Sequence, residues 1–121
     1  MDKNKVFDER YPTFGTAVLK LLPQLPHNKG GTHLGDQLFR SGTLVGAHLQ
    51  EATAAESKAD FIHKMQMALK EMREAKYWLS LILLADILST EIISGLLQES
   101  DELVAILTRS GDCFRNLSRS A

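Results

Sequence analysis

The sequence lacks the features that mark a secreted or membrane protein. Its 121 residues include a single cysteine, Cys113, which cannot form a disulfide within the chain. No charged leader followed by an apolar run and a small-residue cleavage site opens it. The longest apolar stretch, residues 77–88, is interrupted by Ser80 and Asp86 and falls short of the roughly 20 residues that span a bilayer. These absences predict a cytoplasmic protein without a membrane segment.

The sequence also lacks an excess of charge of either sign. Lysine and arginine number 14, and aspartate and glutamate number 15. Proteins that bind nucleic acid through their overall charge are strongly basic, so this chain would need a local basic patch to do so. Its length suits one hydrophobic core and is too short for two. We therefore expect residues 1–121 to form a single domain.

Proline is absent from residues 32–121, where the good helix formers Leu, Ala, Glu, Met, Gln and Lys recur. This predicts an all-α fold. A first helix is expected near residues 12–22, because Pro12 suits a first turn while Pro23 and Pro26 end the helix before a turn at Gly30-Gly31.

Three longer helices follow from capping signals and apolar periodicity. Thr32 is expected to cap a second helix that runs to about Ala54, and Ser57 with Asp60 forms a capping box that opens a third helix reaching about Leu88. Ser89 is expected to cap the fourth. Apolar residues at alternating spacings of four and three define one buried stripe on each helix. The predicted stripes are Leu34, Leu38, Ser41, Val45, His48 and Ala52; Phe61, Met65, Ala68, Met72, Ala75, Leu79 and Ile82; and Ile92, Leu96, Glu99, Leu103, Ile106, Ser110, Cys113 and Leu117.

Short connections between long helices make sequential neighbours antiparallel, so the expected fold is an antiparallel up-down-up-down four-helix bundle. The second half of the third helix is apolar on every side, which one bundle would not cover. We therefore predict a homo-oligomer. The alternative is that the third helix is enclosed by its own bundle. The predicted interface residues are Phe39, Tyr77, Trp78, Leu81 and Leu84.

Short motifs occur in residues 38–51, 60–62, 68–71 and 74–79. Together they resemble a bacterial family of four-helix-bundle proteins associated with intervening sequences in large-subunit ribosomal RNA genes. The family pattern has Gln-Leu-x-Arg-Ser in the second helix, then Asn-Ile-x-Glu-Gly, then Glu-x-x-Tyr-Trp-Leu in the third. The likeness covers roughly residues 7–118. His48 and Leu49 replace Asn-Ile, and Ala52 replaces the glycine. The matching residues are Gln37, Leu38, Arg40, Ser41, Glu51, Tyr77, Trp78 and Leu79.

This resemblance implies a four-helix bundle, a homopentameric ring in several members, and no established enzymatic activity. A related accessory protein of diversity-generating retroelements binds nucleic acid and a reverse transcriptase through a basic surface. The near-neutral charge of this chain does not match that surface. We therefore carry over no nucleic-acid contacts.

His48-x-x-Glu51 and Asp60-x-x-His63 are similar to the paired motifs of di-iron bundles, in which Glu-x-x-His pairs project inward. Against a metal site, His63 points away from the core stripe, Asp60 is used as a cap, and the further inward glutamates are missing. We expect no metal, cofactor or catalytic site. No phosphate loop or nucleophile elbow is present either, so the chain is not expected to be an enzyme.

Three polar residues beside the core stripe of the second helix, Gln37, Arg40 and Glu51, are expected to fix helix or subunit packing. Arg40 and Glu51 are about three turns apart, so each needs its own partner. Cys113 lies in an apolar stripe and is expected to be inert.

A weaker alternative function is nucleic-acid binding by a basic face repeated around an oligomer. Its candidate residues are Arg109, Arg115 and Arg119. Interleaved acidic residues favour a solvated helix face instead. The sequence thus predicts a non-enzymatic homo-oligomer, a pentamer by the resemblance, that serves as a structural or adaptor module.

Overall fold

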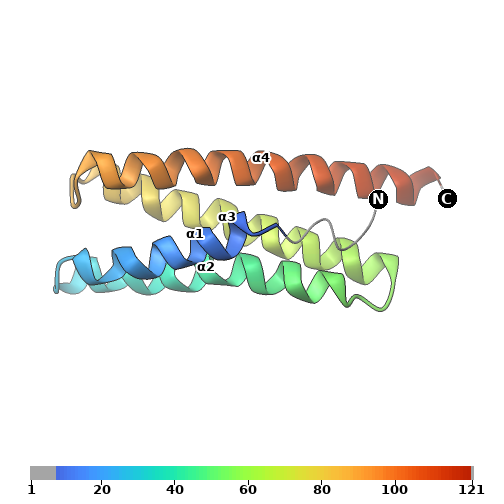
Figure 1. The fold of residues 1–121 in the computed structure, drawn as a ribbon, viewed down its shortest axis with the longest axis horizontal. Coiled ribbons are helices and arrows are strands. Elements are labelled where there is room, and N and C mark those ends of the chain that lie inside the picture. Colours follow the sequence, from blue (N-terminus) through green and yellow to red (C-terminus); the bar gives the residue numbers. More distant parts are fainter. Residues whose placement is uncertain (1–7, 121) are drawn as a thin grey trace.

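Four α-helices make up the part of the chain that the structure describes (Figure 1). The computed structural model describes the backbone of residues 8–120 and the side chains of residues 8–112. A short 3₁₀ turn, η2, follows the first helix. The bounds are α1 Arg10–Leu21, η2 Leu22–Gln24, α2 Lys29–Thr53, α3 Lys58–Leu84 and α4 Thr90–Ser120.

The helices pack in the order of the sequence, which confirms the up-down bundle. α2 packs against both α1 and α3, and α3 packs against both α2 and α4, whereas α1 meets α4 along a much smaller contact. The α1–α2 and α3–α4 connections lie at one end of the molecule, and the α2–α3 connection lies at the other (Figure 1). Because α1 is the shortest helix, α4 extends well past it.

The core stripe predicted for α3 is confirmed in full, since all seven of its residues are buried. The stripe of α2 is confirmed from Leu38 to Ala52, and it gains Leu49, which is wholly buried. α1 adds four large apolar side chains at helical spacing. These are Tyr11, Phe14, Val18 and Leu21.

α2 begins earlier than predicted. Asn28, not Thr32, is the N-cap, and its side-chain oxygen accepts a hydrogen bond from the Gly31 backbone N–H at 2.8 Å. Gly30 and Gly31 therefore lie in the first turn of α2 and not in a connecting turn. Gly31 suits this place because a Cβ there would lie 2.0 Å from the carbonyl oxygen of Pro26.

The predicted start of α3 is confirmed. Ser57 Oγ accepts from the backbone N–H of Asp60 at 3.0 Å, while the Asp60 carboxylate accepts from the N–H of Glu56 at 3.3 Å. The predicted end at Leu88 is wrong, because α3 stops at Leu84.

The cause is a Schellman turn after α3. Asp86 adopts a left-handed backbone with φ 54° and donates its N–H to Leu83 O, while Ile87 donates to Ile82 O. Ile87 and Leu88 then turn back onto the core.

The stripe predicted for α4 is wrong by one position along much of its length. Ile93 and Leu107 are buried in place of Ile92 and Ile106, and Ser100 is buried in place of Glu99. Apolar residues occur in adjacent pairs on this helix, so two neighbouring stripes fit the pattern. A serine whose hydroxyl bonds to Leu97 O at 2.7 Å is far easier to bury than a carboxylate.

Among the residues that the structure describes, no helix has a stretch long and apolar enough to cross a membrane.

Candidate interaction surfaces

The side of α3 that points away from the core carries two of the exposed large hydrophobic residues of the bundle, Tyr77 and Leu84. We call it the α3 outer face. Leu84 is 81% exposed and Tyr77 is 55% exposed, while Leu81 is half-buried. Lys70 and Arg73 extend the same side toward the start of the helix, since spacings of three and four keep residues in line. The α3 outer face consists of Lys70, Arg73, Tyr77, Leu81 and Leu84.

Trp78, another predicted interface residue, is largely engaged by its own chain. Its indole Nε1–H donates to Glu74 Oε1 at 3.2 Å, and its ring meets those of His33 and Tyr77 edge-on at 5.7 and 5.1 Å. Trp78 is half-buried and packs against the core. It borders the α3 outer face and packs edge-on against the ring of Tyr77.

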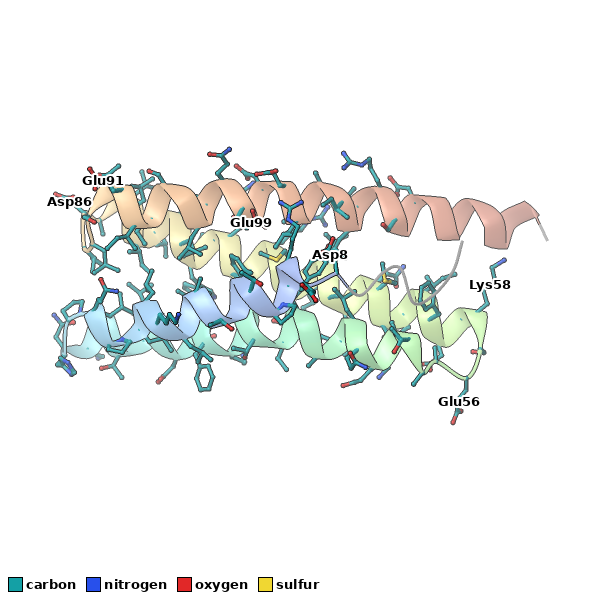
Figure 2. All side chains as sticks on the ribbon, viewed as in Figure 1. Asp8, Glu56, Lys58, Asp86, Glu91 and Glu99 are labelled. Carbon is teal, nitrogen blue, oxygen red and sulfur yellow. The ribbon has the colours of Figure 1, made fainter. Side chains whose placement is uncertain are left out.

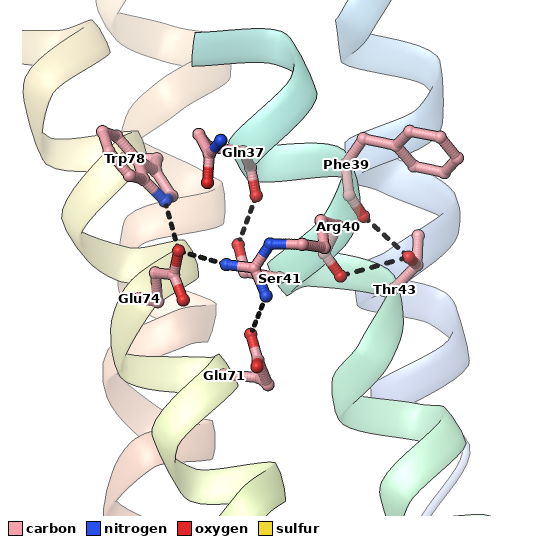
Figure 3. Close-up of polar contacts among 8 residues, drawn as sticks. All are labelled: Gln37, Phe39, Arg40, Ser41, Thr43, Glu71, Glu74 and Trp78. Carbon is pink, nitrogen blue, oxygen red and sulfur yellow. Dashed lines mark hydrogen bonds and ion pairs between the residues drawn. The ribbon is translucent and has the colours of Figure 1, made fainter. Parts of the chain in front are cut away.

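Phe39 lies apart from these residues. It is 49% exposed and lines a groove with Leu22 and Leu25, on the side of α2 that adjoins α1. Figure 3 shows its ring directed away from Trp78, with Arg40 between them. The structure therefore divides the predicted interface into two surfaces, with four residues on or beside the α3 outer face and Phe39 alone on the other.

Arg40 joins α2 to α3 through two carboxylates (Figure 3). Its Nη1 donates to Glu71 Oε2 at 2.9 Å, and its Nη2 donates to Glu74, which also accepts from Trp78. Glu71 is buried, with 8% of its surface exposed. The hydrogen bond from Arg40, helped by the one from Trp78, lowers the pKa of Glu74. The hydrogen bond to Glu74 in turn raises the pKa of Arg40.

Glu51 has a different partner, as its distance from Arg40 predicted. Lys64 on α3 donates to Glu51 Oε2 at 2.8 Å near the far end of the α2–α3 contact. That hydrogen bond lowers the pKa of Glu51 and raises that of Lys64. Gln37 is half-buried beside the Arg40 junction, and its backbone carbonyl accepts from Ser41 Oγ at 2.8 Å.

The basic residues do not form one continuous patch among the side chains that can be placed. Lys76 is paired with Asp101 at 2.6 Å, and Glu71 and Glu74 turn toward Arg40, which leaves Lys70 and Arg73 exposed on the α3 outer face. Arg109 is exposed on α4. The side chains of Arg115, Arg119 and Cys113 lie outside the described residues.

The two acid–histidine motifs do not come together. His48 is buried in the core, with its Nδ1 lacking a hydrogen-bond partner in the described part of the chain, whereas His63 is exposed on α3. Over residues 8–112, no three His, Cys, Asp or Glu side chains are grouped so that they could hold a metal ion.

The seam between α1 and α4, which the sequence did not reveal, carries a charged cluster. Arg10 Nε donates to Glu99 Oε1 at 2.8 Å, and its Nη2 donates to Glu99 Oε2 at 3.1 Å and to Glu102 at 3.4 Å. The carboxylates raise the pKa of Arg10, chiefly through the hydrogen bonds that Arg10 donates to Glu99. Asp8 and Glu99, both labelled in Figure 2, line the same groove at this seam. The charge of Glu99 was the one available signal, because a carboxylate rarely lies within a core stripe.

Comparison with known proteins agrees with the fold. Residues 8–109 match the model of the 23S rRNA-intervening sequence protein family. A crystal structure from Bacteroides thetaiotaomicron, of a protein of unknown function from the S23 ribosomal protein family, superposes with a TM-score of 0.81. The two sequences are 31% identical, and the match covers 93% of this chain and 99% of that one. No curated protein sequence matches this chain.

Proposed function

The chain belongs to the 23S rRNA-intervening sequence protein family, and we propose that it works as a non-enzymatic homo-oligomer, a pentamer, that serves as a structural or adaptor module. The observation that carries this proposal is the exposure of Leu84 and Tyr77 on the α3 outer face, at 81% and 55%. A monomer would leave both in water beside the half-buried Leu81.

The energetics favour covering this surface. Burying a leucine or an aromatic side chain completely contributes roughly 1.5 to 3 kcal/mol, so two such residues together can offset a sizeable part of the cost of association. Trp78 adds rigidity, because its hydrogen bond to Glu74 and its ring contacts hold it in place before any partner arrives. Little ordering of this surface is then needed on binding.

The number five comes from the family resemblance. The proposal gives the protein no catalytic role, and the expectation that the chain is not an enzyme stays a prediction.

The mass in solution tests the proposal. Light scattering at micromolar concentration should give about five times the 13.5 kDa of one chain. Leu84→Glu and Tyr77→Glu should each shift the protein toward the monomer, while Gln98→Glu, an exposed change on α4, should not. A wild-type protein that is monomeric under these conditions would refute the proposal.

A second candidate is nucleic-acid binding by basic side chains brought together in the oligomer. It is supported by the exposure of Lys70 and Arg109, which leaves their charges available to phosphates. The protein should then retain RNA or DNA at low salt, and Lys70→Ala with Arg109→Ala should weaken that retention. Absence of retention at low salt would exclude this function.

A further inference from the structure

The α1/α4 seam is the least closed junction of the bundle. α1 touches α4 along a small contact, and the ion pairs of Arg10 with Glu99 and Glu102 bridge it. Beside them lies a groove with an apolar floor of Phe14, Ala17 and Leu96. Ile92, which is 41% exposed, continues this floor, since Ile92, Leu96 and Glu99 follow one another at spacings of four and three on α4.

The rim of the α1/α4 seam is acidic. Its carboxylates are those of Asp8, Glu9, Glu99 and Glu102, and Arg10 is the one cation among the lining residues that the structure describes. Arg10 is already shared between Glu99 and Glu102, so the rim keeps a net negative charge. A partner that suits the seam therefore presents an apolar ridge next to one or two positive charges.

The α3 outer face has this chemistry. Leu84 and Tyr77 form the exposed apolar ridge, and Arg73 and Lys70 follow at the other end. Neither base belongs to an ion pair within residues 8–112, and neighbouring Glu74 is turned toward Arg40. The two surfaces are thus complementary both in apolarity and in charge.

Their register is also complementary. Lys76 on α3 is paired with Asp101 on antiparallel α4, so the two residues lie at the same height along the bundle. Eight residues further along α3, Leu84 lies at the height of Ile93, which is eight residues before Asp101 on α4. Three residues before Lys76, Arg73 lies at the height of Val104, three residues after Asp101. Leu84 is therefore level with Ile92 and Leu96, and Arg73 is level with Glu102.

We propose that the α3 outer face of one protomer docks on the α1/α4 seam of the next copy, with Leu84 against Ile92 and Leu96 and with Arg73 against the acidic rim. This inference rests on the proposed self-association and adds which surfaces meet. The contact is heterologous, since two different surfaces pair. Because the matching groups share one height, copies related by rotation about an axis along the bundle meet without a rise, which is what a closed ring requires.

Apolar substitutions test the pairing. Leu84→Glu and Ile92→Glu should each raise the dissociation constant of the full-length oligomer by at least about tenfold, as measured by sedimentation, because either places a carboxylate in the same contact. Leu19→Glu is the matched control, since Leu19 is 47% exposed but lies on the α1/α2 side. Circular dichroism should show unchanged helix content in all three.

A charge exchange makes the test specific. Arg73→Glu and Glu102→Arg should each weaken assembly by about five- to tenfold, and the double variant should regain most of the lost affinity, because the exchanged charges at positions 73 and 102 then attract each other again. An oligomer that Leu84→Glu breaks but Ile92→Glu leaves intact, or a double variant no better than the singles, would overturn the pairing and leave the proposed oligomer standing. A monomeric wild type would instead refute the proposed function itself.

Discussion

Arg40 and Glu71 form an ion pair at 2.9 Å in which the two partners differ sharply in exposure, with 42% of the arginine side chain exposed and 10% of the glutamate. The Arg40 guanidinium on α2 therefore neutralises the charge of the buried Glu71 carboxylate on α3. Replacing only the cation leaves a charge with little access to water, which is far more destabilising than losing an exposed pair.

We therefore expect Arg40→Ala to lower the free energy of unfolding by about 2 kcal/mol in urea denaturation. Arg109→Ala, which removes an exposed arginine of α4, should change it by less than about 0.5 kcal/mol. Adding Glu71→Gln to Arg40→Ala should recover part of the loss, since a neutral amide is cheaper to bury. Equal effects of the two arginine substitutions would show that Glu71 does not depend on Arg40.

The extent to which the sequence predicts this fold differs between helices. On α3 the residues outside the core stripe are often polar in the first half of the helix, as at Lys64, Lys70 and Arg73. The stripe set there continues through the second half, where the outside is apolar as well, and all of it is buried. On α4 the apolar residues come in adjacent pairs such as Ile92-Ile93, and periodicity alone does not choose between them. The packing of α4 against α3 within the bundle decides which residue of each pair is buried.

The sequence predicts the residues of a candidate surface only where they all lie on one helix. The exposure of Tyr77 and Leu84 follows from the direction in which they leave α3. The pairing of Arg40 with Glu71 and Glu74, and of Arg10 with Glu99, joins residues far apart in the sequence. Such pairs depend on how the helices are aligned lengthwise, and connection length and caps do not fix that alignment.

Two glycines should respond in opposite ways to the same substitution. At Gly31 a Cβ would lie 2.0 Å from the carbonyl oxygen of Pro26, so Gly31→Ala forces the η2–α2 connection to move and should destabilise the protein by roughly 2 kcal/mol. At Gly95, on the exposed side of α4, a Cβ would meet nothing within 4 Å.

Gly95→Ala should therefore stabilise the protein by about 0.5 to 1 kcal/mol, because alanine loses less backbone entropy in a helix. Midpoints of thermal unfolding for the two variants should fall on either side of the wild-type value. A Gly31→Ala protein as stable as the wild type would mean that the close approach to Pro26 relaxes at little cost.

Replacing Asp86 by glycine should make the protein more stable. Its left-handed φ of 54° at the end of α3 strains any residue with a Cβ, and glycine adopts this conformation freely. We expect Asp86→Gly to raise the free energy of unfolding by about 0.5 kcal/mol and Asp86→Ala to lower it by a similar amount, as measured in urea. If both substitutions changed stability in the same direction, loss of the aspartate side chain would explain the result better than backbone strain.

Tyr11 should make the stability of the bundle depend on pH at the alkaline end. Its ring is 3% exposed, and its hydroxyl is buried without a hydrogen-bond partner in the described part of the chain. Burial, together with the negative charge of Asp8, raises the pKa of Tyr11 from 10.0 to about 12. The Tyr11 hydroxyl therefore holds its proton more tightly in the folded state than in the unfolded state. The free energy of unfolding keeps its full value below pH 10 and falls as the pH rises toward 12.

Tyr11→Phe keeps the ring and removes the hydroxyl. We expect the variant to be as stable as the wild type at pH 7, or more stable by up to about 1 kcal/mol, because an unpaired buried hydroxyl is costly. Between pH 10 and 12 it should lose less stability than the wild type in urea titrations. Tyr77→Phe is the control, since Tyr77 is 55% exposed. A Tyr11→Phe protein that is much less stable at pH 7 would show that the hydroxyl has a bonding partner in solution, and parallel curves at high pH would show that Tyr11 does not titrate on unfolding.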